Sequence, residues 1–270
     1  MRRFRPSLAM LVLAALLPAA AVRAEETARQ ILDRAKQLDD TTRKWTDRSQ
    51  TLTLTIHGKT GADRERSLQI FDKRGANDED KSLTFFLAPS EVKGTAFLQW
   101  SHHDKDDEQW LYLPELKRSR RITSQLKDQS FMGTDFSYRD LEILAKIRDW
   151  TEAEATSSLA GGEDVDGHAC WAIALAPTAK DAGYGKIVLF LDKEQLVTRK
   201  VAFYDAGGTA VKTLVQTDVK NVGAIPTAYH TEMVTPAKES KTTVVMSEVK
   251  YDTGLADDFF TERQMQRGPK

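Results

Sequence analysis

The sequence contains a single cysteine, Cys170, among its 270 residues. One cysteine cannot form a disulfide within the chain, and it cannot supply a cysteine-rich zinc site. The sequence also lacks an excess of charge of either sign, because 39 lysines and arginines stand against 40 aspartates and glutamates, for a formal net charge of -1. A nucleic-acid-binding protein concentrates basic residues to displace counterions, so this balance argues against that class.

Recognisable catalytic motifs are missing as well. The sequence has no G-x-S-x-G, no H-E-x-x-H and no phosphate-binding glycine loop. We therefore expect no enzymatic activity, no cofactor and no resident metal. With 40% hydrophobic and 29% charged residues, the composition is that of a globular protein and not of a disordered chain.

The first 24 residues have the three parts of a secretory signal peptide. Three arginines within the first five residues form a basic segment, residues 8–17 an apolar core and residues 22–24 a small-residue cleavage site. We expect cleavage after Ala24, which leaves residues 25–270 as a single exported, soluble domain. Removing four of the 39 basic residues and no acidic one leaves a net charge of about -5. In a Gram-negative cell the destination is the periplasm.

Hydrophobic periodicity predicts one N-terminal helix followed by a long series of strands. From Ala28 to near Trp45, apolar residues recur at the spacing of an amphipathic helix. In residues 51–56 three aliphatic residues alternate with three threonines, which is typical of a strand with one apolar face. Twelve further segments, separated by turn residues, have strand character: residues 66–73, 82–87, 95–100, 109–113, 119–122, 152–159, 169–176, 186–192, 197–204, 210–217, 227–234 and 242–251.

Residues 124–148 interrupt the strand pattern with an apolar loop and a second helix, whose apolar face includes Leu141 and Leu144. Successive hairpins without interleaved helices favour an antiparallel sheet. Because two helical segments cannot cover a flat sheet of this size, the sheet must curl around them. The predicted fold class is mainly β (α+β), a strongly curved antiparallel half-barrel.

Two histidine-containing segments are candidates for a metal site or a reactive site. Residues 102–108, His-His-Asp-Lys-Asp-Asp-Glu, include metal-ligand types, but adjacent residues on a strand point to opposite faces. We favour a solvated hairpin tip over a metal site there. His168 and Cys170 can share one strand face, and we favour a filled core position and a strand edge over a reactive site.

The densest positive patch is the run Lys117, Arg118, Ser119, Arg120 and Arg121. A solvated strand edge explains it. Alternatively, the four basic residues contact an acidic partner surface or lipid phosphate, because guanidinium groups match phosphate geometry. The sequence leaves both interpretations open.

Two segments resemble a known family. Residues 110–122, WLYLPELKRSRRI, and residues 130–141, SFMGTDFSYRDL, closely resemble the LolA/LolB-like outer-membrane lipoprotein-sorting proteins. They are most similar to the branch found beside RND/MMPL-type exporters. Shorter similarities lie at residues 165–167, 171–177, 187–192, 199–201 and 257–261, so the resemblance covers essentially the whole mature chain.

The resemblance implies an open barrel of about eleven strands with a helical lid over an apolar concave face. It also implies a periplasmic carrier or chaperone for acyl chains, with an inner-membrane exporter of the ABC or RND/MMPL type as a partner and an outer-membrane acceptor. A related member with this fold instead senses envelope stress by binding a regulatory protein. The dedicated lipoprotein carrier is shorter and uses an arginine that hydrogen-bonds to its lid; Arg64 or Arg66 lies in the corresponding region.

We expect acyl chains of a lipoprotein or another lipid to bind in the concave face. The candidate wall residues are Leu52, Leu54, Ile56, Phe85, Leu98, Trp100, Trp110 and Tyr112, and the candidate lid residues are Phe131, Met132 and Phe136. Strand parity places Leu98 with Trp100 on one face, and Trp110 with Tyr112, but it does not decide which face of these pairs points inward. Ordinary core packing would use the same aromatic residues. The alternative function is a non-enzymatic adaptor or regulatory sensor that binds a membrane transporter or signalling protein through residues 117–121.

Overall fold

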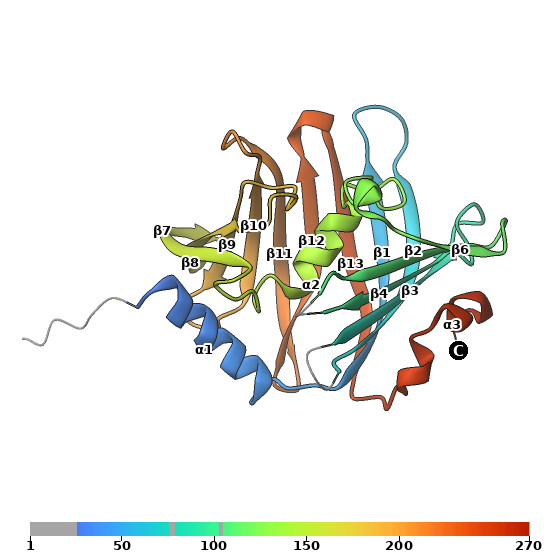
Figure 1. The fold of residues 1–270 in the computed structure, drawn as a ribbon, viewed down its shortest axis with the longest axis horizontal. Coiled ribbons are helices and arrows are strands. Elements are labelled where there is room, and N and C mark those ends of the chain that lie inside the picture. The colour runs from blue at the N-terminus through green and yellow to red at the C-terminus, as the bar shows by residue number, and fades with distance from the viewer. Residues whose placement is uncertain (1–25, 76–78, 103–104, 270) are drawn as a thin grey trace, which may run out of the picture.

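The computed structural model describes residues 26–75, 79–102 and 105–269. The predicted signal peptide, residues 1–24, and His103 and Asp104 of the histidine-containing segment lie outside the described residues. Within the described part of the chain, thirteen strands form one antiparallel sheet (Figure 1). The strands are β1 Asp47–His57, β2 Arg64–Lys73, β3 Asp80–Ala88, β4 Ala96–Ser101, β5 Glu108–Leu113, β6 Arg118–Arg121, β7 Ala155–Val165, β8 His168–Pro177, β9 Lys186–Asp192, β10 Thr198–Tyr204, β11 Ala210–Val222, β12 Ile225–Thr235 and β13 Ser240–Tyr251.

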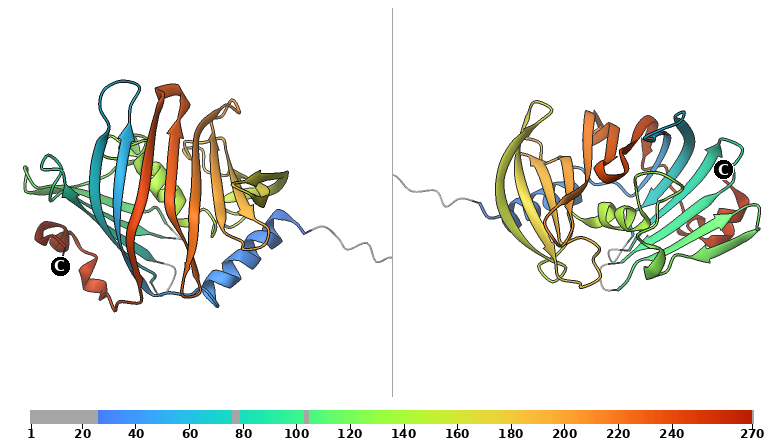
Figure 2. Two further views of the ribbon diagram at one scale, coloured as in Figure 1. Left: turned by 180° about the vertical axis from the view of Figure 1, so that it is seen from behind. Right: turned by 90° about the horizontal axis from the view of Figure 1, so that it is seen from above.

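The sheet is open, with β6 at one edge and β7 at the other. Its strand order is β6-β5-β4-β3-β2-β1-β13-β12-β11-β10-β9-β8-β7, so two meanders meet where β1 pairs with β13. Viewed from above, the strands curl around α2 (Figure 2). The predicted curved half-barrel is therefore confirmed, and each of the thirteen predicted strand segments corresponds to a strand. The count exceeds the eleven that the family resemblance implied.

Three α-helices occur in the described residues: α1 Ala28–Asp40, α2 Tyr138–Lys146 and α3 Glu262–Arg267. Single 3-10 turns lie at Ser124–Leu126, Pro236–Lys238 and Asp257–Phe259. None of these helices has the length and apolar character needed to cross a membrane. The prediction that the first helix continues to near Trp45 is wrong, because Thr41 leaves the helical conformation and its hydroxyl donates to the Gln37 carbonyl oxygen at 2.6 Å.

The concave face of the sheet and the helices α1 and α2 share the largest hydrophobic core. On β9, Ile187, Leu189 and Leu191 point into this core, while the alternate residues Val188 and Phe190 belong to a separate cluster on the convex face. A capping box at Thr27 starts α1, whose apolar side is buried in the same core as β9. The smallest helix, α3, lies outside the sheet near β3, β4 and β5 (Figure 1).

Candidate functional site

An apolar cavity of about 320 Å³ lies between α2 and the concave face of the sheet. This volume falls within the range of about 300–1,000 Å³ that is usual for ligand sites. The sheet contributes apolar side chains from β1, β2, β4, β11 and β13, and the lid, which we define as residues 130–146, covers them. The apolar lining residues are Leu52, Leu54, Leu68, Ile70, Phe97, Phe131, Phe136, Leu141, Leu144, Ala145, Leu214 and Val244.

A second cavity of about 470 Å³ adjoins the first at the end of the barrel where α1 ends and β1 begins. The two share lining residues, including Leu52, Leu144 and Val244. The second cavity is more polar, and four arginines line it: Arg43, Arg48, Arg74 and Arg148. An apolar interior is thus continuous with a charged mouth.

Part of the predicted binding set lies at the apolar cavity. Leu52 and Leu54 line its wall, and Phe131 and Phe136 line it from the lid. Ile56, 2% exposed, follows on the same face of β1, and Met132 packs against the same core. Ligand binding by these residues stays a prediction.

Five predicted wall residues lie on the other face of the sheet, so that assignment is wrong. Phe85, Leu98, Trp100, Trp110 and Tyr112 pack on the convex side, in a cluster covered by Phe259 and Phe260 and by Met265 of α3. Their sequence neighbours Phe86, Phe97 and Leu111 point into the concave core instead. A register error of one residue moves a strand's whole side-chain set to the opposite face.

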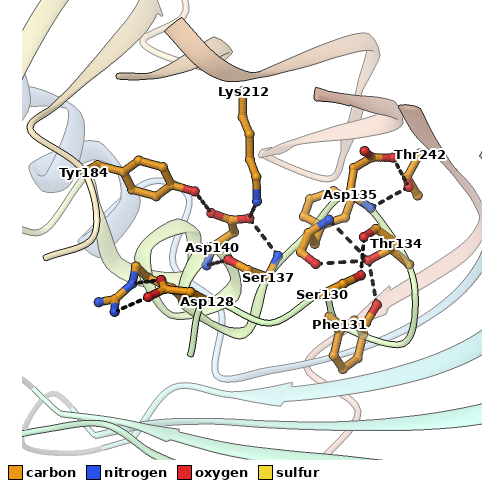
Figure 3. A network of polar contacts seen from close by, with 12 residues as sticks. Asp128, Ser130, Phe131, Thr134, Asp135, Ser137, Asp140, Tyr184, Lys212 and Thr242 are labelled. Atoms are coloured by element: carbon orange, nitrogen blue, oxygen red, sulfur yellow. Dashed lines mark hydrogen bonds and ion pairs between the residues drawn. The ribbon is translucent and has the colours of Figure 1, made fainter. Parts of the chain in front are cut away.

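The lid is tied to the sheet by buried carboxylates, of which Asp140 is the most enclosed (Figure 3). Asp140 accepts hydrogen bonds from the Ser137 backbone N–H at 2.7 Å, from the Tyr184 hydroxyl at 2.6 Å and from Lys212 Nζ at 2.5 Å. Burial and the neighbouring Asp140 carboxylate raise the pKa of Tyr184, so its hydroxyl keeps the proton that it donates. This one carboxylate therefore connects α2 to β11 and to the loop before β9.

A second carboxylate, Asp135, attaches the lid loop to β13. It accepts hydrogen bonds from the Thr242 hydroxyl at 2.8 Å and the Ser240 hydroxyl at 2.5 Å, and its own N–H donates to Thr242 Oγ1 at 2.9 Å (Figure 3). Within the loop, the Thr134 hydroxyl donates to the Phe131 carbonyl oxygen at 2.7 Å. Gly133 permits the tight turn, because its φ of 78° lies in the left-handed region. The predicted apolar loop is therefore a hydrogen-bonded turn that places Phe131 at the cavity.

A third attachment comes from the histidine-containing segment. Asp107 accepts from the His102 backbone N–H at 3.0 Å and from Lys146 Nζ, at the end of α2, at 2.9 Å. His102 and Asp107 are 4% and 6% exposed, so the prediction of a solvated tip is wrong for these two residues. Within the described residues, no group of His, Cys, Asp and Glu side chains is arranged to hold a metal ion. The sequence did not indicate a lid contact here, because Lys146 is 39 positions from Asp107.

The second histidine candidate, His168, lies 3.1 Å from Asp192 through its Nδ1 atom. Asp192 also pairs with the buried Arg199, at 2.9 Å. Cys170 is 1% exposed and belongs to the convex cluster of β8, β9 and β10. The predicted core position of Cys170 is confirmed.

Of the two arginines suggested by the family resemblance, Arg64 reaches the lid. Its Nη2 donates to the Gly133 carbonyl oxygen at 3.4 Å. Burial lowers the pKa of Arg66, and its Nε atom is buried without a hydrogen-bond partner. The structure thus brings Arg64, at the start of β2, against the turn that carries Phe131.

The basic run lies on β6, the edge strand, and on the turn that precedes it. Lys117, Arg118, Arg120 and Arg121 are all exposed. Arg121 is paired with Glu108 at 3.4 Å, on the convex side shared with Trp110, while Arg120 lies opposite Leu111. These positions agree with either interpretation of the run, so a partner contact stays a prediction.

The chain is similar to solved structures that share this lidded half-barrel. It is 31% identical to an outer membrane lipoprotein-sorting protein domain from Vibrio parahaemolyticus, over 88% of this chain and 97% of that chain, with a TM-score of 0.80. It is 28% identical to a DUF1329 family protein from Desulfovibrio piger, over 88% and 99%, also with a TM-score of 0.80. A LolA superfamily protein from Nitrosomonas europaea, 17% identical over 89% and 100%, has the same fold with a TM-score of 0.66.

A family model described as that of an uncharacterized protein matches residues 78–267, and no curated protein matches the chain. With its open, strongly curved antiparallel sheet and a helical lid over an apolar cavity, the chain has the half-barrel fold that it shares with the LolA superfamily protein from Nitrosomonas europaea. Among proteins with this fold, the chain belongs to the outer-membrane lipoprotein-sorting protein family.

Proposed function

We propose that the protein is a non-enzymatic periplasmic carrier that binds acyl chains of a lipoprotein or another lipid beneath its lid and moves them toward the outer membrane. The cavity between α2 and the concave face carries this proposal, because its lining is mostly apolar and shields a hydrocarbon chain from water. The export signal predicted in residues 1–24 and the family relationship support the periplasmic location. The partners are then an inner-membrane exporter and an outer-membrane acceptor.

The attachment of the lid suggests how a carrier of this kind takes up and releases cargo. Hydrogen bonds and ion pairs fix the lid at Asp135 and Asp140, whereas its apolar side chains only fill the cavity. An acyl chain can replace the contacts of Phe131 and Phe136 by contacts of the same apolar kind. We infer that the cargo displaces the aromatic side chains of the lid while the buried carboxylates keep the lid attached.

Neighbouring valines on β13 provide a matched test. Val244 lines the cavity, whereas Val245 is 45% exposed. A glutamate at position 244 puts a carboxylate into the apolar cavity, so V244E should lower the affinity for a fluorescent fatty acid at least about tenfold, or about 1.4 kcal/mol. V245E should bind like the unaltered protein. Equal binding by both folded variants would contradict the cavity assignment.

Native mass spectrometry with lipid extraction, on protein purified from the periplasm, identifies the cargo. A stoichiometric acylated species supports the carrier. A protein that stays empty when offered lipids and acylated peptides argues against it.

The exposed arginines at the sheet edge favour a second candidate, an adaptor that binds a membrane transporter or signalling protein. An edge strand offers unpaired backbone groups, and Arg118, Arg120 and Arg121 add positive charge beside them. Replacing these three arginines with glutamine should weaken capture of a membrane partner and leave fatty-acid binding unchanged. Unchanged capture would remove the support for this candidate.

A further inference from the structure

The charged mouth of the cavity contains more guanidinium than carboxylate. Four arginines line it, and Asp39 and Asp149 are its acidic lining residues. Arg48 forms an ion pair at 2.8 Å with Asp72, which is not one of the residues that line the mouth. The other three arginines lie in different parts of the chain. Arg43 follows α1, Arg74 follows β2 and Arg148 follows α2.

These three arginines share one carboxylate. Asp39 lies 2.9 Å from Arg148 and 3.9 Å from Arg43, and the charge of Arg74 also acts on it. Burial nevertheless raises the pKa of Asp39, and burial together with Arg148 lowers the pKa of Arg43. When several partly desolvated positive charges share one counter-ion, binding of a further anion is favourable.

Neighbouring groups complete a polar recess around the arginines. Arg74 stacks on the Trp45 ring, 4.4 Å from its centroid, which orients its guanidinium. The Arg148 Nε atom and the Thr198 hydroxyl are buried without a hydrogen-bond partner, and both residues line the mouth. The recess therefore has hydrogen-bond donors that its own acceptors leave unsatisfied.

The mouth is continuous with the apolar cavity through Leu52, Leu144 and Val244. An acyl chain beneath the lid would place whatever group is attached to its end near the arginines. Arginine is suited to phosphate oxygens because its planar fork donates two parallel hydrogen bonds. A neutral head group would leave the donors of the recess unsatisfied.

We propose that Arg43, Arg74 and Arg148 bind the phosphate of an anionic amphiphile whose acyl chain lies in the apolar cavity. This inference rests on the proposed carrier function and narrows its substrate to lipids with a phosphate-bearing head group. Asp39 acts as the internal substitute for that phosphate and holds the arginines in place when the mouth is empty.

Two lipids with the same palmitoyl chain test the proposal. Palmitoyl lysophosphatidylglycerol has an anionic phosphodiester, and monopalmitoylglycerol is neutral. Displacement of a fluorescent acyl probe measures the two affinities. The unaltered protein should bind the anionic lipid at least about tenfold more tightly than the neutral lipid, and added NaCl should reduce this preference. R43Q/R74Q should lose the preference but still bind the neutral lipid, whereas D39N should strengthen it because one competing carboxylate is removed.

R263Q, at an exposed position on α3, is the matched control and should keep the preference. Equal affinity of the unaltered protein for the two lipids would overturn the inference and leave the carrier function standing. Failure of both lipids to bind would instead contradict the carrier function. If the double variant does not fold, as judged by circular dichroism, D39N and the salt dependence decide the question.

A further experiment distinguishes binding of a free phosphate compound from binding of a lipid head group. Inorganic phosphate and glycerol phosphate are offered to the lipid-free protein in calorimetry. Binding at least about tenfold weaker than that of the anionic lipid supports the head-group assignment, because the acyl chain must contribute through apolar burial. Binding as tight as that of the lipid would overturn it in favour of a soluble phosphate compound.

Discussion

The Asp140 carboxylate, in the first turn of α2, lies 2.5 Å from the ammonium group of Lys212 on β11. The two residues are 72 positions apart, and their contact joins the lid to the half of the sheet that follows it in sequence. Asp140 is fully buried and the Lys212 side chain is 13% exposed. The lid is therefore held over the cavity by a buried ion pair as well as by apolar packing.

Breaking that ion pair should loosen the lid. K212M leaves Asp140 buried without its cation, which should lower the free energy of unfolding by about 3 kcal/mol. Hydrogen exchange in α2 should accelerate, and urea unfolding measures the stability. Lys220, also on β11, is 61% exposed where it pairs with Asp218, so K220M should cost less than about 1 kcal/mol. Similar losses for the two variants would show that the buried pair does not secure the lid.

The cluster under α3 should be important for stability and not for acyl binding. Phe260 is completely buried on the convex face, and its carbonyl oxygen accepts from Trp100 Nε1 at 3.1 Å. F260A should cost about 3–5 kcal/mol through loss of apolar contacts and creation of a cavity. Fatty-acid affinity should stay unchanged at a temperature where the variant is folded. L116A, at a position 62% exposed, should alter stability by less than about 0.5 kcal/mol.

Asp47 should make the stability depend on pH in acid. Burial alone would raise the pKa of Asp47, but hydrogen bonds from the Thr253 hydroxyl and the N–H groups of Thr253 and Gly254 outweigh it and hold the pKa below 3.8. A lowered pKa in the folded state adds stability above pH 3.8, which is lost as the pH falls from 3.8 through the lower folded value.

Urea unfolding of the D47N variant across that pH range tests this contribution. The variant should be less stable than the unaltered protein at neutral pH, and the difference should shrink as the pH falls below 3.8. The stability of the D47N variant should still depend on pH in acid. The reason is that Asp192 also has a lowered pKa, because the hydrogen bonds to its carboxylate outweigh the effect of burial. A constant difference from neutral to acid pH would contradict the role assigned to Asp47.

Cys170 should be chemically inert in the folded protein. Burial, with a smaller contribution from the negative charge of Asp192, raises its pKa to about 11. The thiolate is the reactive form, so a chromogenic disulfide reagent should label the native protein only slowly at neutral pH. Denaturant should release one reactive thiol per chain. Rapid, complete labelling of the native protein would show that the convex cluster of β8, β9 and β10 opens readily.

The strands were predictable because most of them alternate in sequence. Leu52 and Leu54 face the cavity, whereas the threonines beside them are only half-buried, so the period of two and the buried face were both readable. On β3 this contrast disappears. Phe85 and Phe86 are each 1% exposed, because α3 and its preceding turn cover one and the concave core encloses the other. Two apolar faces cannot be told apart by polarity, and the inward assignment failed there.

The sequence by itself determined where the strand segments lie, their antiparallel succession, the start of the first helix and the family, because local alternation, turn residues and two long motifs carry that information. Tertiary structure decided which residues meet. Asp135 accepts a hydrogen bond from Thr242, which is 107 positions away in the sequence. Asp39 comes to lie near Arg43, Arg74 and Arg148 only when the sheet curls and α2 packs over it. A polar side chain in a sequence has no assigned partner, because burial and long-range pairing arise only when the chain is folded.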